Sequence, residues 1–112
     1  MTVLADEIWA DLVYSPHVHR SFLQIQQENV MCFFAASKSF NIAGLHVSVC
    51  VSYDSHLKEL LSFKQKEIHL VSTNVFGLAA LEAALVKCDH WLVDFKEYLL
   101  QNAVFCCQFL KE

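Results

Sequence analysis

The feature that most constrains this chain is a continuous apolar run, Val30 to Ala36, that ends directly in Ser37, Lys38 and Ser39. An uninterrupted run of this length is typical of a strand covered on both faces, as in the parallel sheets of α/β proteins. Such a strand needs helices on either side of its sheet. The run therefore predicts an α/β fold in which polar side chains follow a buried strand.

Two other segments also predict strands. Thr2 to Ala5 is a short apolar run that ends in Asp6 and Glu7, which suits a buried strand with polar groups at its carboxyl end. Leu45 to Tyr53 alternates between apolar and small polar side chains, with the period of two residues expected of a strand. Between the first two strands, Tyr14 to Arg20 contains the only proline and predicts a surface loop.

The second half of the chain predicts three helices. Asp54 suits the N-cap of a helix that ends near Glu67, and a second helix is expected from about Asn74. Asp89 suits the cap of a long third helix that runs toward the C-terminus. Its apolar stripe comprises Trp91, Leu92, Phe95, Leu99 and Phe105. A few strands followed by three helices could form a small α+β domain, but strands buried on both faces favour part of a larger α/β sheet.

Composition excludes several classes of function. The formal net charge of −4 provides no basic field for nucleic acid or for anionic membranes. No apolar run approaches the roughly 20 residues of a membrane helix, and the N-terminus lacks a secretion signal, so we expect a cytoplasmic protein. In a chain of 112 residues, a large exposed apolar face would need a partner surface.

The cysteines and histidines do not predict a metal site. Five cysteines without regular spacing, most of them in apolar stretches, are expected to be reduced and to pack as small hydrophobic residues. Cys106 and Cys107 are neighbours, but adjacent residues of a helix point to different sides and make a poor chelate. His17 and His19 alternate as on an extended segment, yet no further ligand motif accompanies them.

Lys38 is the strongest candidate for chemistry. A lysine directly after a buried strand can be desolvated, and desolvation favours the neutral amine, which condenses with an aldehyde to form a Schiff base. Most lysines in turns are simply solvated, so position alone does not establish this role.

The segment around Lys38, Ser-Lys-Ser-Phe-Asn-Ile-Ala-Gly-Leu, resembles the cofactor-lysine segment of fold-type I pyridoxal-phosphate enzymes of the aminotransferase class I and II superfamily. Ala5 to Tyr14 resembles the same family's Asp-Glu-Ile segment. Thr73 to Ala84 and the following Trp91 and Leu92 resemble the branch that contains cystathionine beta-lyases of the PatB and MalY kind. Three segments match in the family's order. The resemblance implies that residues 1–112 are part of the large domain of such an enzyme, an aminotransferase-like domain truncated at both ends.

The resemblance also implies roles for single residues. Asp6 would contact the pyridine nitrogen of pyridoxal 5'-phosphate and keep the ring an electron sink. Lys38 would carry the cofactor as a Schiff base and then remove the substrate's α-proton. The hydroxyl of Ser37 would help bind the phosphate.

Two positions depart from the family pattern. Trp9 stands where many aminotransferases place a tyrosine for the phenolic oxygen of the cofactor, and it offers only an indole donor. His46 stands where many members carry a phosphate-binding arginine, and it is a weaker, pH-dependent cation. The family's phosphate-binding loop, its ring-stacking aromatic residue and its carboxylate-binding arginine have no counterpart in the chain.

The function that the resemblance implies is a carbon–sulfur β-lyase, which removes the α-proton of cystathionine or a cysteine conjugate and then eliminates a thiol. An aminotransferase shares Asp6 and Lys38, so these motifs leave both reactions open. A third hypothesis is a catalytically inactive fragment or interaction module, since most of the family's binding groups are missing. The family is homodimeric, with active sites at the dimer interface.

Overall fold

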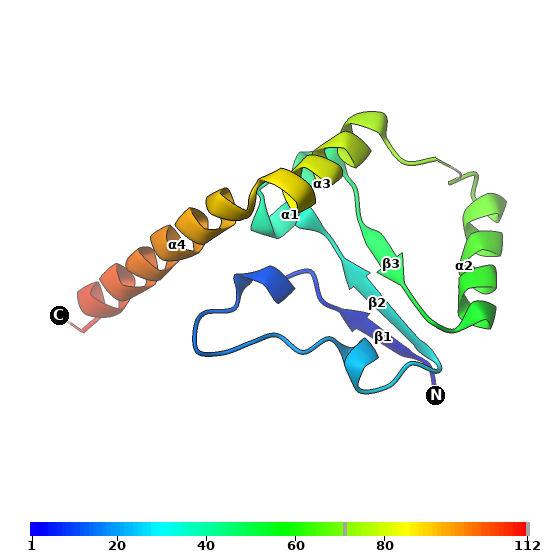
Figure 1. Cartoon of the computed structure of the whole chain (residues 1–112), viewed down its shortest axis with the longest axis horizontal. Helices are drawn as coiled ribbons and strands as arrows, with labels where there is room; N and C mark the ends of the chain where they lie inside the picture. The colour runs from blue at the N-terminus through cyan, green and yellow to red at the C-terminus, as the bar shows by residue number, and fades with distance from the viewer. Residues whose placement is uncertain (71, 112) are drawn as a thin grey trace.

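The computed structural model describes residues 1–70 and 72–111, and its centre is a three-stranded mixed sheet (Figure 1). The strands are β1 (Val3–Asp6), β2 (Val30–Phe34) and β3 (Val49–Val51), in the order β1-β2-β3. β1 pairs with β2 in parallel, with Asp6 opposite Phe33, whereas β3 runs antiparallel to β2. The carboxyl ends of β1 and β2 therefore lie at the same edge of the sheet.

The first two strands follow the prediction closely, and the third is much shorter than predicted. β1 extends one residue beyond Ala5, so Asp6 is its last residue. The segment from Leu45 to Tyr53 keeps only three strand residues, because Ala43–Leu45 forms a 3₁₀ helix (η3) and His46 adopts a left-handed conformation with φ of 50°. A left-handed residue cannot continue an extended strand, so the alternating pattern overestimated β3.

A short helix that the sequence did not predict follows β2. Helix α1 (Ala36–Ser39) begins after Ala35, which offers no side-chain cap, so Lys38 lies in a helical turn instead of an irregular one. Ala36 and Ser39 are buried, whereas Lys38 is exposed and Ser37 is half-buried. One turn of helix is not stable alone, so the packing of Ala36 and Ser39 determines where α1 lies.

The three long helices are present, and one of the two predicted caps is correct. Asp54 caps α2 (Ser55–Glu67), since its Oδ1 accepts from the Leu57 amide at 3.1 Å. Asn74 caps α3 (Val75–Lys87) through a 3.0 Å bond from the Phe76 amide. The prediction for α4 (Asp89–Phe109) was wrong by one residue, because Asp89 is inside the helix and Cys88 takes the cap position.

The hydrophobic core lies between α1, α3 and the segment before β3. It comprises Ala36, Val47, Leu81 and Ala84, with Phe40 and Ile42 packed against it. Small residues of α3 allow this close approach. A second group of stacked rings continues the contact into α4: the ring centroids of Phe40 and Trp91 are 5.6 Å apart, and those of Trp91 and Phe95 are 4.8 Å apart.

Much of the apolar surface remains exposed. α4 extends away from the sheet (Figure 1), and none of the residues Asp89–Phe109 is buried. The predicted stripe on this helix is only partly covered, since Trp91 is 42% exposed and Phe105 is 66% exposed. On the sheet, Val30 and Cys32 are fully buried, but Leu4 of β1 is exposed. The strands are therefore not all covered on both faces within this chain.

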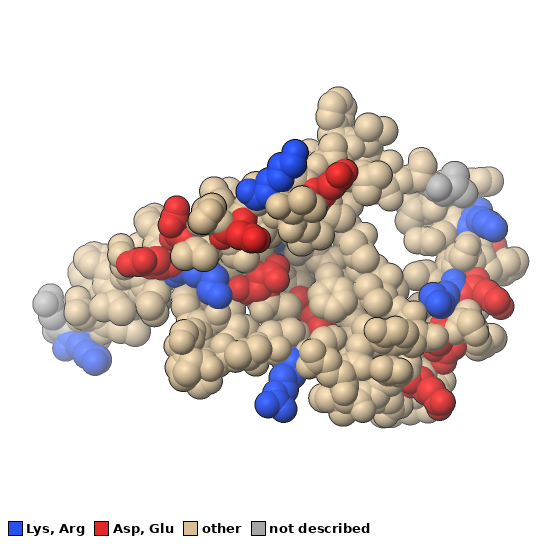
Figure 2. Space-filling view, viewed as in Figure 1, with Lys and Arg blue, Asp and Glu red and all other residues tan. Residues whose placement is uncertain are grey.

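Charged side chains do not gather into one basic surface on the face that Figure 2 shows. Acidic and basic residues are mixed along the arm formed by α3 and α4 and again along α2, and most of the remaining surface is uncharged. Within residues 1–70 and 72–111, no helix combines the length and the apolar character that a membrane span requires.

Candidate functional site

The candidate site lies at the edge where the parallel strands β1 and β2 end. Asp6 is the last residue of β1, and Ser37 and Lys38 lie in α1, which begins two residues after β2. In open α/β sheets, ligands bind outside the carboxyl ends of the strands. The topology thus brings the acidic candidate and the lysine candidate to one edge.

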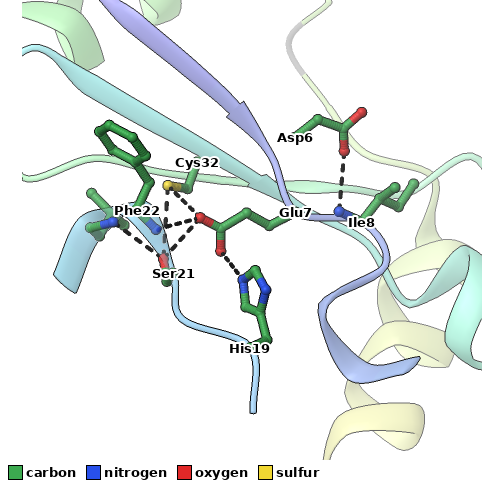
Figure 3. Close-up of polar contacts among 8 residues, drawn as sticks. Asp6, Glu7, Ile8, His19, Ser21, Phe22 and Cys32 are labelled. Carbon is green, nitrogen blue, oxygen red and sulfur yellow. Dashed lines mark hydrogen bonds and ion pairs between the residues drawn. The ribbon is translucent and has the colours of Figure 1, made fainter. Parts of the chain in front are cut away.

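Asp6 lines a cavity of about 180 Å³ together with Ile8, Phe33, Phe34, Ala35 and Ser48. Its side chain is exposed, and Oδ1 accepts a hydrogen bond from the Ile8 amide at 3.1 Å (Figure 3). This bond holds the carboxylate at the strand end. The other oxygen has free lone pairs for a ligand, since an ionised carboxylate can accept several hydrogen bonds.

Lys38 lines an adjoining cavity of about 260 Å³. The other lining residues are Ile8, Ala35, Ser37, Ala43, His46, Val47 and Ser48. The two cavities share the lining residues Ile8, Ala35 and Ser48, so they form one continuous surface. Four of the predicted site residues, Asp6, Ser37, Lys38 and His46, are brought together around it.

The desolvation expected for Lys38 is not seen. Its side chain is exposed, although it lines this cavity. The sequence pattern thus predicted that Lys38 follows a buried strand, but it did not predict that the side chain is exposed to solvent.

Trp9 and His46 occupy different surroundings. Trp9 precedes the 3₁₀ helix η1 (Ala10–Leu12), is 60% exposed and lines neither of these two cavities. His46 ends η3 in a left-handed conformation, and its amide donates to the Ala43 carbonyl at 3.2 Å. Histidine is among the residues that tolerate this conformation. It turns the backbone so that His46 and Ser48 both line the cavity of Lys38.

Sequence reasoning missed the three residues that line both cavities, Ile8, Ala35 and Ser48. A signal for Ile8 was present, since a residue two positions after Asp6 lies on the same face when the strand period continues. Ser48 belonged to the polar side of the predicted third strand. Ala35 has no polar group and no distinctive spacing, and only its place between β2 and α1 brings it to the cavity.

Glu7 lies on the face of β1 opposite to Asp6, and its pKa is strongly shifted. Its Oε1 accepts from the Phe22 amide at 2.8 Å, from Ser21 Oγ at 3.1 Å and from Cys32 Sγ at 3.2 Å, and His19 Nε2 lies 2.9 Å from Oε2 (Figure 3). Burial opposes ionisation, but these hydrogen bonds outweigh it and lower the pKa of Glu7 to about 2. Glu7 is therefore a buried carboxylate that stays ionised.

Metal ligands are not gathered at this edge or elsewhere in the described part of the chain, where no group of three or more His, Cys, Asp or Glu side chains could hold an ion. All five cysteines are free thiols. Cys32 is buried, as expected of a small hydrophobic residue, whereas Cys106 and Cys107 are exposed on α4, contrary to that expectation.

The sequence is similar to that of a characterised bacterial enzyme. The chain is 34% identical over 106 residues to cystathionine beta-lyase PatB of Bacillus subtilis (strain 168), and the match covers 91% of the chain. It spans 27% of the length of that relative. No family model matches the chain.

Solved structures show the same fold over nearly the whole chain. A PLP-bound protein of Clostridium difficile 630, assigned to the aminotransferases, superposes with a TM-score of 0.92 at 33% identity and covers 97% of the chain. The PLP-bound C-S lyase of Staphylococcus hominis superposes with a TM-score of 0.88 at 26% identity and covers 99% of it. The chain spans 29% and 28% of these two proteins. In sequence and in fold, the chain thus matches part of the large domain of fold-type I pyridoxal-phosphate enzymes of the aminotransferase class I and II superfamily.

Proposed function

We propose that this chain forms part of the active site of a pyridoxal-phosphate-dependent carbon–sulfur β-lyase, which releases a thiol, pyruvate and ammonia from cystathionine or a cysteine conjugate. One observation carries the proposal: Asp6 and Lys38 lie around adjoining cavities at one sheet edge, in a chain 34% identical to a cystathionine beta-lyase. Two of its structural neighbours are PLP-bound.

The donors around the two cavities fit the parts of the cofactor. The Asp6 carboxylate would hold a proton on the pyridine nitrogen, because a fixed negative charge there favours the protonated ring. The hydroxyl of Ser37 and the imidazole of His46 line the other cavity, where they would contact the phosphate. Ile8 and Ala35 would provide apolar contact for the ring between these polar ends.

Lys38 would carry out the covalent and proton-transfer steps. When bound, pyridoxal phosphate supplies an electron sink for the negative charge that develops at the substrate's α-carbon. Lys38 Nζ would hold the cofactor's aldehyde carbon until the substrate amine displaces it, and would then accept the α-proton. Because Lys38 is exposed in α1, its amine is accessible both to the cofactor and to the substrate.

The whole enzyme would extend beyond this chain. Since residues 1–112 span 27–29% of the relatives' lengths, we infer that they are one part of a larger aminotransferase-like domain. Further groups for the phosphate and the substrate carboxylate would come from outside this part. A cytoplasmic location and a homodimeric state belong to the same proposal.

An aminotransferase is the second candidate, and the Clostridium difficile neighbour favours it. Asp6 and Lys38 would serve both reactions, which differ in whether a leaving group departs or the proton returns to the cofactor. Pyruvate release from cystathionine without a keto-acid acceptor would indicate the lyase. A strict requirement for such an acceptor would indicate the aminotransferase.

A catalytically inactive fragment or interaction module is the third candidate, favoured by the exposed apolar surface. Phe63 and Tyr98 are 57% and 60% exposed. Aromatic side chains dominate the energy of protein interfaces, so these two could bind a partner. Specific binding of the cofactor by the purified chain would contradict a role limited to protein interaction.

The experiment that tests the proposal is an absorbance titration of the purified chain with pyridoxal phosphate, followed by borohydride reduction and mass mapping. Saturable modification of Lys38 is the expected result. Lys38→Ala should abolish it, whereas Lys58→Ala, which removes an exposed lysine of α2, should not. Weak modification spread over many lysines would contradict the proposal.

A further inference from the structure

Glu7 is a buried carboxylate next to a candidate cofactor ligand, and the proposed chemistry does not use it. It is 7% exposed, whereas Asp6, its neighbour in the chain, is exposed at the cavity. Consecutive residues of a strand point to opposite faces, and Figure 3 shows the two carboxylates directed away from each other. Glu7 therefore cannot reach a ligand bound at Asp6, and any effect on that ligand must pass through the backbone.

The Glu7 side chain ties three separate segments together. Phe22 N, Ser21 Oγ and Cys32 Sγ all donate to Oε1. At 2.9 Å from Oε2, the imidazole of His19 also donates, because an ionised carboxylate only accepts. These partners belong to the loop between β1 and β2 and to β2 itself. One carboxylate thus joins the tip of β1, the neighbouring strand and a loop 12 to 15 residues away.

The part of this loop that contacts Glu7, residues 19–22, has few other polar contacts in the described part of the chain. It leads into the 3₁₀ helix η2 (Phe22–Gln24), which is capped by Ser21, whose Oγ accepts from the Leu23 amide at 3.3 Å. Val18 and Ile25 on either side of this turn are 81% and 72% exposed, so they add little packing. The hydrogen bonds to Glu7 are therefore the main polar attachment of residues 19–22 to the sheet.

The backbone at Glu7 also sets the direction of Asp6. The Glu7 amide donates to the Phe33 carbonyl at 2.9 Å, and the Glu7 carbonyl accepts from Ala10 at 3.0 Å. Within residues 1–70 and 72–111, the hydrogen bond that the Asp6 carboxylate accepts comes from Ile8, the residue on the far side of Glu7. Movement at Glu7 would displace both the Asp6 backbone and the amide that orients its side chain.

We propose that Glu7 is a positioning residue: through His19, Ser21, Phe22 and Cys32 it holds the tip of β1 so that Asp6 faces the pyridine nitrogen of the cofactor. This inference rests on the proposed function. It assigns to the buried carboxylate a role in cofactor recognition that is exerted entirely from the opposite face of the sheet.

The test compares two ligands, because Asp6 can act on only one of them. Pyridoxal phosphate has a ring nitrogen, and an analogue with C–H in place of that nitrogen keeps the aldehyde and phosphate but offers Asp6 no partner. Binding of each to the full chain is measured by titration and by borohydride trapping on Lys38. Glu7→Gln preserves size and removes the charge, and Glu59→Gln makes the same change on the exposed face of α2 as the control.

We expect Glu7→Gln to weaken binding of pyridoxal phosphate about tenfold and to leave binding of the analogue within about twofold of the unchanged chain. Glu59→Gln should leave both ligands unaffected. An equal loss for both ligands, or no loss for either, would overturn the positioning role while leaving the proposed function intact. Absence of specific Lys38 trapping in the unchanged chain would overturn both.

A second variant covers the case in which Glu7→Gln does not fold, which circular dichroism would reveal. His19→Gln removes one partner of Glu7, and the His19 side chain is 33% exposed, so its loss is easier to tolerate. The same selective weakening of pyridoxal phosphate, in a smaller amount, is expected. Equal binding of both ligands by His19→Gln and by the unchanged chain would contradict the proposal.

Discussion

The hydroxyl of Ser39 donates a 2.9 Å hydrogen bond to the carboxylate of Asp11. Ser39 is in α1, next to Lys38, and is fully buried, whereas Asp11 lies in η1, five residues after Asp6. This bond directly links the segment that follows β1 to the segment that follows β2. Because α1 has a single turn and no side-chain N-cap, the bond helps to fix the orientation of Lys38.

Removing this hydroxyl is expected to destabilise the chain. Ser39→Ala loses one hydrogen bond and should lower the free energy of unfolding by about 1 kcal/mol, as measured by urea denaturation. Ser37→Ala, two positions earlier in α1, is the matched control and should change stability by less than about 0.5 kcal/mol. Equal effects of the two substitutions would show that the bond to Asp11 does not hold α1 in place.

The two glycines of the chain are expected to respond in opposite ways to a methyl group. A Cβ at Gly77 would lie 2.8 Å from the Leu45 carbonyl oxygen and 3.2 Å from Val47 Cβ, whereas a Cβ at Gly44 meets no atom within 4 Å. Gly77→Ala should therefore cost about 1–2 kcal/mol, since the clash with backbone exceeds the gain in helix propensity. Gly44→Ala should be neutral or stabilising by up to about 1 kcal/mol. Thermal denaturation of both variants checks the contrast, and a stable Gly77→Ala chain would contradict it.

Glu7 is expected to make stability sensitive to acid. Its pKa in the folded chain is about 2, below the ordinary value of 4.5 that applies to the unfolded chain. The contribution is therefore fully present above pH 4.5 and is lost as the pH falls toward 2, by about 3 kcal/mol in total. Urea denaturation at pH 7, 4 and 3 should show the stability advantage over Glu7→Gln shrinking with decreasing pH. A constant difference across this range would contradict the assignment.

The five cysteines are expected to differ widely in reactivity. Burial and the neighbouring Glu7 carboxylate raise the pKa of Cys32, and burial also raises the pKa of Cys50. The thiolate is the reactive form, so iodoacetamide should modify the exposed Cys106 and Cys107 first and Cys32 last, with the order read by mass spectrometry. In concentrated urea the differences should disappear. Early modification of Cys32 under native conditions would show that the Glu7 cluster opens readily.

Local signals in the sequence predicted the elements whose structure depends on local interactions. The apolar run at Val30 predicted β2, and Asp54 and Asn74 predicted the starts of α2 and α3, because a cap bonds to amides two or three residues away. The sequence also predicted that polar residues follow both apolar strands, and the parallel pairing of β1 with β2 in the structure brings Asp6 and Lys38 to one edge. Where the interacting residues are close together in the sequence, the residue types alone were sufficient to predict the structure.

Elements that depend on distant contacts were missed. α1 is too short to form by itself, and only the burial of Ala36 and Ser39 against other segments makes it helical. The third strand was predicted too long, because the left-handed conformation of His46 and the 3₁₀ turn before it are not visible in an alternating pattern. The exposure of Lys38 was missed for a related reason, since solvation depends on which elements cover a side chain.

The sequence by itself thus determined the class of fold, the approximate positions of β1, β2 and the three long helices, and the residue types that follow the two strands, because each depends on periodicity or on neighbours along the chain. Tertiary structure alone decided the Glu7 cluster, whose partners lie 12 to 25 residues away, and the bond between Asp11 and Ser39, 28 residues apart. Hydrogen bonds over such separations leave no periodic signal. They form only once packing of the strands and the loop has brought the groups within about 3 Å of one another.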